Sequence, residues 1–294
     1  MIKEVSAFVK SFDKLGYIVD EELATVLFLM TRLQKPLLLE GHPGVGKTEV
    51  ANILAAHLGT ELIRLQCYEG LDVHSAVYEW NYQKQLLSIK IQESNQKTDL
   101  EKEKHIFGKD FLMPRPLLKA ISGIDKPPVL LIDEIDRADE EFEAFLLELL
   151  SVYQISIPEF GTIKAAHPPL VILTSNRTRE LSDALRRRCL YHWVSYPSFE
   201  KEIKIVRKHL PDIEQKLSEQ VVKVINVLRH KNLEKSPGIS ETLDWAMSLH
   251  VLGRSELDEE SFSKTQGSVL KSYSDTEKIK AEGLGKVLEE ATSP

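Results

Sequence analysis

Residues 40–50 read EGHPGVGKTEV and follow the apolar run PLLL at residues 36–39. They match the pattern G-x-x-x-x-G-K-[ST], in which the backbone amides of a glycine-rich loop and the positive end of the next helix surround a phosphate chain. The fixed positions are Gly41, Gly46, Lys47 and Thr48. The lysine of such a loop reaches the β- and γ-phosphates, and the hydroxyl after it binds Mg²⁺. The stretch therefore predicts a phosphate loop, residues 41–48, between a strand and a helix.

The segments around this loop alternate between two apolar patterns. Short continuous apolar runs bounded by proline or polar residues are typical of strands buried on both faces of a parallel sheet. Apolar residues at three- and four-residue spacing are typical of helices. Strands that alternate with helices predict a doubly wound α/β domain. The predicted strands are residues 37–39, 61–67, 128–133 and 169–176, and the predicted helices are residues 21–34, 47–58 and 141–150.

The pattern changes near residues 195–202. Beyond them, apolar residues from Ile213 to Leu228 recur at helical spacing, and no strand pattern of comparable strength follows. Ser240 is a candidate N-cap for the helix ETLDWAMSLHVL, which ends at Gly253. The predicted domains are residues 1–197, which are α/β, and residues 198–294, which are a small helical domain with a polar tail.

Composition limits the classes of function. The chain has 294 residues and a formal net charge of −7, which argues against a protein that mainly grips nucleic-acid phosphates. Its two cysteines, Cys67 and Cys189, form no CxxC pair, which favours reduced thiols over a disulfide or zinc site. The longest apolar stretch, residues 23–30, is far shorter than the roughly 20 residues that span a bilayer. The N-terminus also lacks the apolar core of a signal peptide, so we expect a cytoplasmic protein.

A second motif, VLLIDEIDRAD at residues 129–139, combines an apolar strand with adjacent carboxylates. A carboxylate at the end of a strand beside the loop strand can hold Mg²⁺ through water, and Asp133 has that position. Glu134 is then placed to polarise the attacking water as a general base. The adjacent pair favours hydrolysis by water over a small-molecule kinase, because a kinase requires a substrate hydroxyl there.

Two further segments carry candidate site residues. Asn176 ends the strand VILTSN, and its amide can orient the attacking water or touch the γ-phosphate, although asparagine is also a common turn former. The segment ALRRRC, residues 184–189, holds three consecutive arginines. They form a solvated face, pair with a carboxylate, or include an arginine finger that reaches the nucleotide of a neighbouring subunit.

Residues 81–112 interrupt the α/β alternation with an alternating apolar piece and a charged run. Such a segment is typical of a solvated loop or helix face, or of an insertion that contacts a partner. The nine histidines show no H-E-x-x-H or H-x-x-E-H pattern, so no protein metal cluster is predicted. His42, in the variable part of the phosphate loop, is interpreted as incidental.

The order of motifs resembles a known family. A phosphate loop, LLIDE, LTSN, ALRRR and then a helical region resemble the AAA+ ATPases, specifically the MoxR branch. Within that branch, YEWNYQKQLL, RPLLKAI and DEIDRADEEFEAFLLELL are similar to the CoxD-type subgroup. The resemblance is dense from about residue 15 to 200. It implies a P-loop NTPase αβα sandwich with a helical lid, and a ring-forming, hexameric ATPase that uses ATP and Mg²⁺ at subunit boundaries.

The resemblance also assigns roles to residues. Asp133 and Glu134 correspond to Walker B, with Asp133 and Thr48 at the Mg²⁺, and Asn176 corresponds to sensor 1. Arg188 is the best match to the finger, because it precedes a position that is usually aromatic and is Cys189 here. Arg187 is the alternative, and Arg186 stays open. The predicted nucleotide-binding residues are Tyr17, Ile18, Gly41, His42, Pro43, Gly44, Val45, Gly46, Lys47, Thr48 and Glu49.

Three regions extend or depart from the family pattern. Residues 81–112 correspond to the insertion in the second helix and residues 155–165 to the hairpin before sensor 1, and both are expected at the working surface of the ring. The lid helix of relatives usually carries a sensor-2 arginine after a glycine-led N-cap. Here PGISETLDWA offers Glu241 and Thr242, so no sensor-2 residue is predicted.

The leading hypothesis is an ATP-hydrolysing chaperone that remodels a protein client. The CoxD-type resemblance implies that the client is a metalloenzyme precursor, a molybdenum hydroxylase similar to carbon monoxide dehydrogenase. It also implies a partner with a von Willebrand factor A domain. The alternative is a nucleic-acid motor on the same AAA+ core, which the acidic balance disfavours.

Overall fold

The computed structural model describes residues 2–92, 105–123, 125–158 and 160–292. These residues form two compact units, which we call the sheet unit, residues 22–40 and 51–192, and the helical unit, residues 1–21, 41–50 and 193–294. The phosphate loop thus belongs to the same unit as the C-terminal helices. The predicted domain boundary between residues 197 and 198 stays a prediction. Within the described ranges, no helix is long and apolar enough to cross a membrane.

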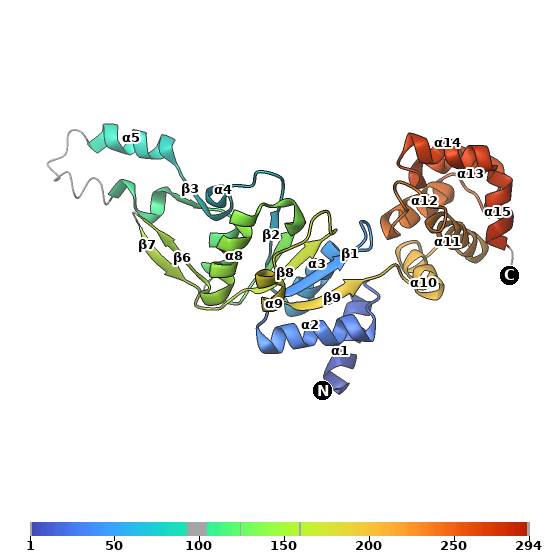
Figure 1. Ribbon diagram of the computed structural model, residues 1–294. Coiled ribbons are helices and arrows are strands. Elements are labelled where there is room, and N and C mark those ends of the chain that lie inside the picture. The colour runs from blue at the N-terminus through green and yellow to red at the C-terminus, as the bar shows by residue number, and fades with distance from the viewer. Residues whose placement is uncertain (1, 93–104, 124, 159, 293–294) are drawn as a thin grey trace. The chain divides into compact units, whose positions relative to one another are not determined.

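A five-stranded parallel sheet with the order β2-β5-β8-β1-β9 is flanked by helices (Figure 1). Its strands are β1 (Leu37–Gly41), β2 (Leu62–Gln66), β5 (Val129–Asp133), β8 (Leu170–Ser175) and β9 (Leu190–Val194). Glu40 pairs with Ser175, and Gln66 pairs with Asp133. The carboxyl ends of β1, β2, β5 and β8 therefore meet at one edge, which is also where the chain leaves β1 for the phosphate loop. The predicted α/β fold with a parallel sheet is confirmed.

Strands β1, β5 and β8 are buried along their whole length and largely apolar because helices cover the sheet. The helices around it are α2 (Glu21–Leu33), α3 (Lys47–Leu58), α7 (Pro116–Ile121), α8 (Glu140–Val152) and α9 (Asp183–Arg188). Phe142 and Leu146 of α8 are buried in one core cluster with Ile132 of β5 and Leu173 of β8. Asp139 begins α8 as its N-cap, where its Oδ1 atom accepts a hydrogen bond from the backbone N–H of Phe142 at 2.8 Å.

Smaller elements extend the sheet unit. They are α4 (Val73–Val77), β3 (Tyr78–Trp80), α5 (Tyr82–Gln92), η1 (Lys109–Phe111), β4 (Leu112–Pro114) and η2 (Ile135–Arg137). β3 and β4 are antiparallel, as are β6 (Gln154–Ile157) and β7 (Gly161–Lys164). The predicted insertion, residues 81–112, contains α5, η1 and β4, and its residues 93–104 lie outside the described residues. The predicted hairpin, residues 155–165, falls on β6 and β7, and residue 159 also lies outside the described residues.

The helical unit has a separate apolar core. Its helices are α1 (Ile2–Lys14), α10 (Phe199–His209), α11 (Gln215–Arg229), α12 (Ile239–Val251), α13 (Glu259–Val269), α14 (Tyr273–Glu282) and α15 (Leu284–Thr292). Trp245 of α12 is fully buried beside Phe262 of α13, with ring centroids 5.0 Å apart, and its indole N–H donates to Thr265 at 2.7 Å. The segment that the sequence presents as a polar tail therefore supplies α13, α14 and α15 to this core.

The start of α12 corrects one detail of the sequence prediction. The N-cap is Gly238, two residues before the predicted Ser240. The Oε2 atom of Glu241 accepts a hydrogen bond from the Gly238 N–H at 2.9 Å, so a carboxylate one turn into the helix caps it. A Cβ atom on Gly238 would lie 2.8 Å from backbone atoms of Gly44. A contact with a distant segment thus selects glycine here, which the local sequence pattern does not reveal.

Candidate functional site

The phosphate loop leaves β1 and enters α3 at Lys47. Gly44 and Gly46 have φ angles of 73° and 90°, in the left-handed region that glycine adopts without strain. Lys47 is 7% exposed, and its Nζ atom donates hydrogen bonds to the carbonyl oxygens of Gly41 at 2.8 Å and His42 at 2.7 Å. The loop thus encloses a cation beside the amide-rich start of α3, an arrangement suited to a phosphate chain.

The other predicted nucleotide-binding residues lie in different surroundings. The ring of His42 lies parallel to that of Tyr196, with centroids 5.0 Å apart, and meets Trp193 edge-on at 5.7 Å. His42 is therefore part of an aromatic cluster, which its interpretation as incidental did not foresee. Val45 is buried, Thr48 and Ile18 are half-buried, and Pro43 and Glu49 are exposed.

Tyr17 lies against the phosphate loop. A Cβ atom placed on Gly46 would be 4.0 Å from the Cε2 atom of Tyr17, and the tyrosine ring meets Phe12 edge-on at 6.3 Å. Burial, followed by the nearby carboxylates of Asp20 and Glu49, raises the pKa of Tyr17. The phenol therefore stays protonated and presents an uncharged aromatic surface beside the loop.

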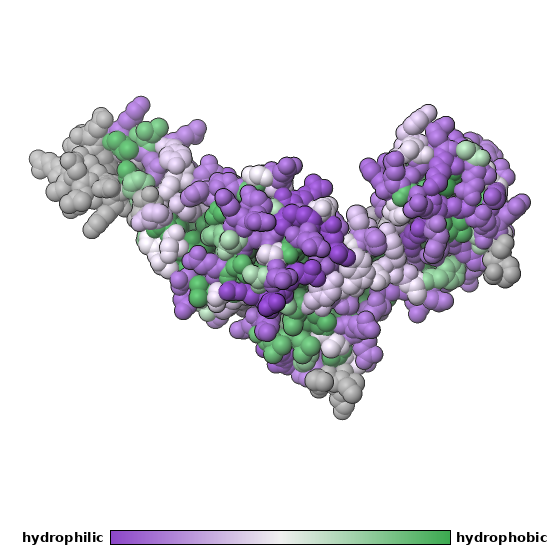
Figure 2. All heavy atoms as spheres, viewed as in Figure 1, coloured by the Kyte–Doolittle hydropathy of each residue, from purple (hydrophilic) through white to green (hydrophobic). Residues whose placement is uncertain are grey.

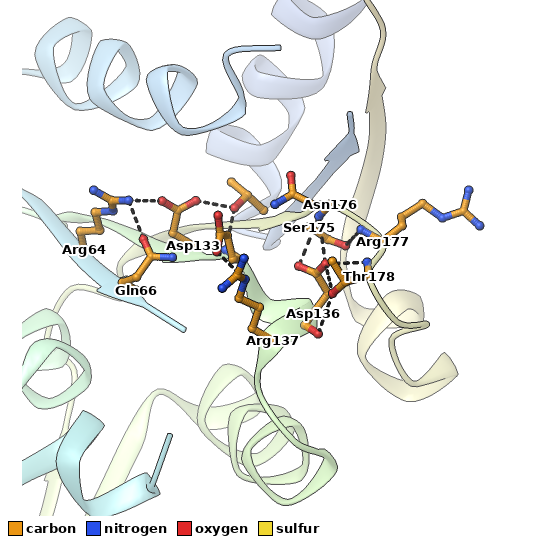
Figure 3. A network of polar contacts seen from close by, with 11 residues as sticks. Arg64, Gln66, Asp133, Asp136, Arg137, Ser175, Asn176, Arg177 and Thr178 are labelled. Atoms are coloured by element: carbon orange, nitrogen blue, oxygen red, sulfur yellow. Dashed lines mark hydrogen bonds and ion pairs between the residues drawn. The ribbon is translucent and has the colours of Figure 1, made fainter. Parts of the chain in front are cut away.

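The carboxylate motif stands at the end of β5 (Figure 3). Asp133 is buried, and its Oδ2 atom pairs with Arg64 of β2 at 2.5 Å. The hydroxyl of Thr174, in β8, donates to the Oδ1 atom of Asp133, also at 2.5 Å. The same arginine donates to Gln66 at 2.5 Å. Both oxygens of Asp133 are therefore held by side chains from the two strands next to β5.

Glu134 adopts a strained conformation. Its φ and ψ angles are 55° and 50°, in the left-handed region that non-glycine residues rarely occupy. Its backbone N–H donates to the hydroxyl of Thr174 at 2.9 Å, and its Oε2 atom pairs with the Nε atom of Arg137 at 2.8 Å. The structure thus turns the chain sharply after Asp133 and fixes the backbone of Glu134 at the sheet edge, where strain is typical of functional residues.

Asp136 organises the turn after β5 and was missed by sequence reasoning. It is buried, and its carboxylate accepts hydrogen bonds from the backbone of Asn176 at 3.2 Å and of Thr178 at 2.8 Å, and from the Thr178 hydroxyl at 2.7 Å (Figure 3). In the sequence, Asp136 could have been noticed as a further acidic residue three positions after Asp133. Asn176 is thereby fixed through its backbone at the end of β8, next along the sheet edge to Glu134.

A buried thiol lies beside these carboxylates. The backbone N–H of Cys67 donates to the carbonyl oxygen of Asp133 at 2.8 Å. Burial, with smaller contributions from Asp133, Asp136 and Glu134, raises the pKa of Cys67 to about 12. The thiol is therefore uncharged at neutral pH.

The three arginines at the end of α9 are all exposed. Arg188 donates to the carbonyl oxygen of Leu147, and the guanidinium of Arg186 lies 5.8 Å from the ring centre of Tyr191. Within the described residues, the side chain of Arg187 makes no hydrogen bond, ion pair or ring contact. All three are accessible to a neighbouring subunit, and the choice of finger stays a prediction.

The sequence profile of the AAA domain, dynein-related subfamily, matches residues 36–189, more than half of the chain. The chain belongs to the AAA domain family. The matched segment runs from the start of β1 to the end of α9 and includes the phosphate loop and the carboxylate motif. This AAA+ chain is therefore an ATPase that binds nucleotide and hydrolyses ATP.

Individual relatives of this AAA+ ATPase are distant. An uncharacterized protein of Staphylococcus haemolyticus is 27% identical over 228 residues, which are 76% of this chain and 78% of the relative. Among solved structures, a mutant of Thermotoga maritima RuvB is 20% identical, with a TM-score of 0.49 over 84% of this chain and 68% of the other. A provisionally assigned ATPase of Cytophaga hutchinsonii is 16% identical, with a TM-score of 0.48 over 99% and 92%. Such partial likenesses carry no information on the substrate.

Proposed function

We propose that this AAA+ ATPase is a MoxR-type chaperone that uses ATP hydrolysis to remodel a protein client. The client is a metalloenzyme precursor, of the class of molybdenum hydroxylases similar to carbon monoxide dehydrogenase. The chaperone works in the cytoplasm as a homo-oligomeric ring, a hexamer, together with a von Willebrand factor A domain protein. The sequence segments that resemble the CoxD-type subgroup support this branch of the family.

The observation that carries the proposal of a protein client is the surface of α5. Tyr82, Leu86, Leu87 and Ile91 are each at least 59% exposed. Among residues 82–91 of α5, the buried side chain is a polar one, Gln85, which donates a hydrogen bond to the carbonyl oxygen of Ile106 at 2.8 Å. Figure 2 shows the resulting apolar surface at the position of α5. Exposed apolar side chains suit contact with a protein, whereas a nucleic-acid motor requires basic ones.

The hydrolysis machinery follows from the residues at the sheet edge and in the loop. The phosphate loop, with Lys47, binds the β- and γ-phosphates, and Tyr17 and Ile18 lie by the adenine. Glu134 takes the proton of the attacking water as general base, and Asn176 orients that water. Thr174 fixes the backbone of Glu134, so the side chain of the proposed base starts from one point of the sheet edge, and its carboxylate leaves Arg137 to meet the water.

The donor set fits Mg²⁺ that the nucleotide itself mainly holds. Within the described residues, no group of three or more His, Cys, Asp or Glu side chains could hold a metal ion. Both oxygens of Asp133 already accept from Arg64 and Thr174, so its natural role is a contact through water. The Thr48 hydroxyl is the direct ligand of the pattern, and the ion supplies charge neutralisation at the transferred phosphate.

A ring explains the exposed arginines. We assign the finger to Arg188, with Arg187 as the alternative because its side chain makes no contact among the residues that the structure describes. Arg188→Ala is expected to retain nucleotide binding and to lose turnover by about 10³- to 10⁵-fold. Mixing it with Lys47→Ala protein should restore part of the activity, since one boundary then has an intact loop and an intact finger. Native mass spectrometry of the mixture checks that the two variants assemble together.

The client is tested with a matched pair of double variants. Leu86→Ser with Leu87→Ser removes adjacent exposed leucines from α5, and Val251→Ser with Leu252→Ser removes two exposed apolar residues at the end of α12. The probe is the apo form of a molybdenum hydroxylase. It should stimulate the ATPase of the parent and of the α12 variant, but not that of the α5 variant. Equal stimulation of all three proteins would contradict the role of α5. Salt-sensitive binding and stimulation by DNA or RNA would instead support the nucleic-acid motor.

A further inference from the structure

A stacked column of side chains joins the phosphate loop to the C-terminal helices within the helical unit. The His42 and Tyr196 rings are nearly parallel, with an angle of 8° between their planes and 5.0 Å between their centroids. On Tyr196, the guanidinium of Arg229, the last residue of α11, lies 4.4 Å from the ring centre. Trp193 closes the edge of the His42 ring at 5.7 Å. All three distances are within the range of attractive aromatic and cation–π contacts.

The helical end of this column is rigid. Arg229 is 5% exposed and forms a bidentate pair with Glu202 of α10, with both N–O distances at 2.7 Å and Glu202 fully buried. Its Nε atom also donates to the carbonyl oxygen of Pro237 at 2.9 Å, and the Thr242 hydroxyl donates to Glu202 at 2.7 Å. A planar guanidinium with this many fixed partners has little freedom to rotate, so it holds Tyr196 in one position.

The same helices reach the phosphate loop at a second point. The backbone N–H of Ile239, the first residue of α12, donates to the carbonyl oxygen of Gly44 at 2.8 Å. Gly238 packs on Gly44 so closely that a Cβ atom on either residue would crowd the other. The pairing of Arg229 with Pro237 ties this contact to the stacked column. The loop is thus supported at Gly44 and at His42 by one network that includes α10, α11 and α12.

This network connects the C-terminal helices to the phosphate loop in a chain for which no sensor-2 arginine is predicted. The chain has Glu241 and Thr242 where the family pattern has a sensor-2 arginine, and the structure uses both residues internally, to cap α12 and to hold Glu202. We propose that His42 and Tyr196 are positioning residues of the phosphate loop, through which helices α10, α11 and α12 hold the loop in the conformation that binds nucleotide. The inference rests on the proposed role of the loop as the nucleotide site. Under this inference, helices α10, α11 and α12 contact the nucleotide site through the first residues of the phosphate loop.

A positioning role differs from direct contact with the nucleotide. If the stack holds the loop, the His42 ring matters as a flat surface and not as a hydrogen-bonding group. Phenylalanine at position 42 should then substitute for histidine, and alanine should not. The loss should also be similar for ATP and ADP, because the whole loop relaxes and both ligands occupy its centre. A contact of the imidazole with the γ-phosphate would instead affect ATP alone and would not survive phenylalanine.

The experiment measures the Kd of fluorescent ATP and ADP analogues for a set of variants of the full chain. His42→Ala and Tyr196→Leu should each weaken binding of both nucleotides by about three- to tenfold, the worth of one aromatic stack. His42→Phe and Tyr196→Phe should bind as the parent does. The double variant His42→Ala with Tyr196→Leu should be no weaker than the worse single variant, because each change removes the same stack. Tyr273→Leu, at an exposed ring of α14, is the control for loss of a tyrosine.

Each outcome separates the inference from the proposed function. Additive losses, parental binding by both single variants, or failure of His42→Phe to restore binding would overturn the positioning role. Lys47→Ala tests the loop itself, and parental nucleotide binding by that variant would overturn the proposed site. Loss of binding in Lys47→Ala with no effect of His42→Ala or Tyr196→Leu would leave the site in place and remove only the present inference. Circular dichroism melting of each variant identifies any change caused by unfolding.

Discussion

The turn after β5 and the loop after β1 leave neighbouring parts of one sheet, but they are held in different ways. The turn is fixed by hydrogen bonds to buried carboxylates, in which Asp133 and Asp136 accept from side chains and backbone of β2, β8 and the residues after β8. The loop is fixed by its own lysine, by aromatic stacking on His42 and by backbone contact with Gly238. Hydrogen bonds to buried carboxylates therefore support the turn, whereas the phosphate loop combines hydrogen bonds of Lys47 and Gly44 with an aromatic stack and a glycine contact.

This difference predicts different effects for substitutions in the turn and in the supports of the loop. The hydrogen bonds of Asp133 and Asp136 hold the backbone of the turn, so the proposed general base, Glu134, starts from a fixed point of the sheet edge. The loop is held from outside by the stack on His42 and by the contacts of Gly44 with Gly238 and Ile239, so a change in these supports should alter the shape of the loop. Variants that affect the turn should therefore alter turnover, and variants that affect the support of the loop should alter nucleotide affinity.

The largest expected effects separate the two regions directly. Glu134→Gln should bind ATP as the parent does but lose about 10²- to 10⁴-fold in turnover, because the base is gone while the loop is intact. Lys47→Ala should lose ATP binding itself. The measurements are equilibrium ATP binding and release of inorganic phosphate. Parental turnover in Glu134→Gln would contradict the role of the turn in hydrolysis. Parental binding in Lys47→Ala would contradict the role of the loop in nucleotide binding.

The next effect concerns the stability of the helical unit, which depends on the buried pair of Arg229 and Glu202. Arg229→Met should lower the free energy of unfolding by about 3–5 kcal/mol, because Glu202 is left charged and buried without its partner. The double variant with Glu202→Leu should lose less than this single variant, since no uncompensated charge remains. Chemical denaturation of all three proteins gives the comparison. A single variant that loses less than about 1 kcal/mol would show that the pair does not hold the helices.

The same division explains what the sequence could predict. The strands β1, β2, β5 and β8 lie within one or two residues of their predicted bounds. For β1, β5 and β8 the reason is burial on both faces, which makes these strands largely apolar. β9, an edge strand with mostly half-buried residues, was not predicted, although β2, the other edge strand, was. The phosphate loop and the Asp133–Glu134 pair were recognisable because their spacing is local. The site roles assigned to them stay predictions until variants are measured.

The supports of the site were not recognisable. Thr174 and Arg64 reach Asp133 from strands far away in the sequence, and nothing in the local pattern distinguishes them from other strand residues. Tyr196 and Gly238 reach the phosphate loop from more than 150 positions away. Their partners are set by the folded chain alone. One sequence shows which residues a reaction needs, but not which residues hold them in place.

Two buried threonines allow the same substitution to be compared beside the turn after β5 and in the helices that support the phosphate loop. Thr174 donates its hydroxyl to Asp133, and Thr242 donates its hydroxyl to Glu202. Replacement of either by valine keeps the shape and removes a hydrogen bond to a buried carboxylate, so each variant should lose about 1–3 kcal/mol of stability. Only Thr174→Val should also lower kcat, because Thr174 fixes the backbone of Glu134 as well. Equal changes in kcat for both variants would show that the effect is general destabilisation.

The smallest expected effect is a pH dependence of the free energy of unfolding, to which the buried thiol of Cys67 beside the turn contributes. Burial and nearby carboxylates raise the pKa of Cys67 to about 12, from an ordinary value of 9.0. The folded state therefore disfavours the thiolate, and the contribution of this thiol is complete below about pH 9 and is lost as the pH rises towards 12. Between pH 7 and pH 9.5 the parent should lose about 1 kcal/mol that Cys67→Ala does not lose.

Cys189 supplies the matched control for this prediction, because burial alone raises its pKa to about 12. Cys189→Ala should flatten the alkaline part of the stability curve by a similar amount, and the double variant with Cys67→Ala by about twice as much, since the two thiols titrate independently. Urea denaturation at a series of pH values gives the slopes. Added salt should weaken only the Cys67 contribution, because only that thiol has carboxylates among the causes of its pKa shift. A slope that neither substitution changes would mean that both thiols ionise in the folded protein as they do in the unfolded chain.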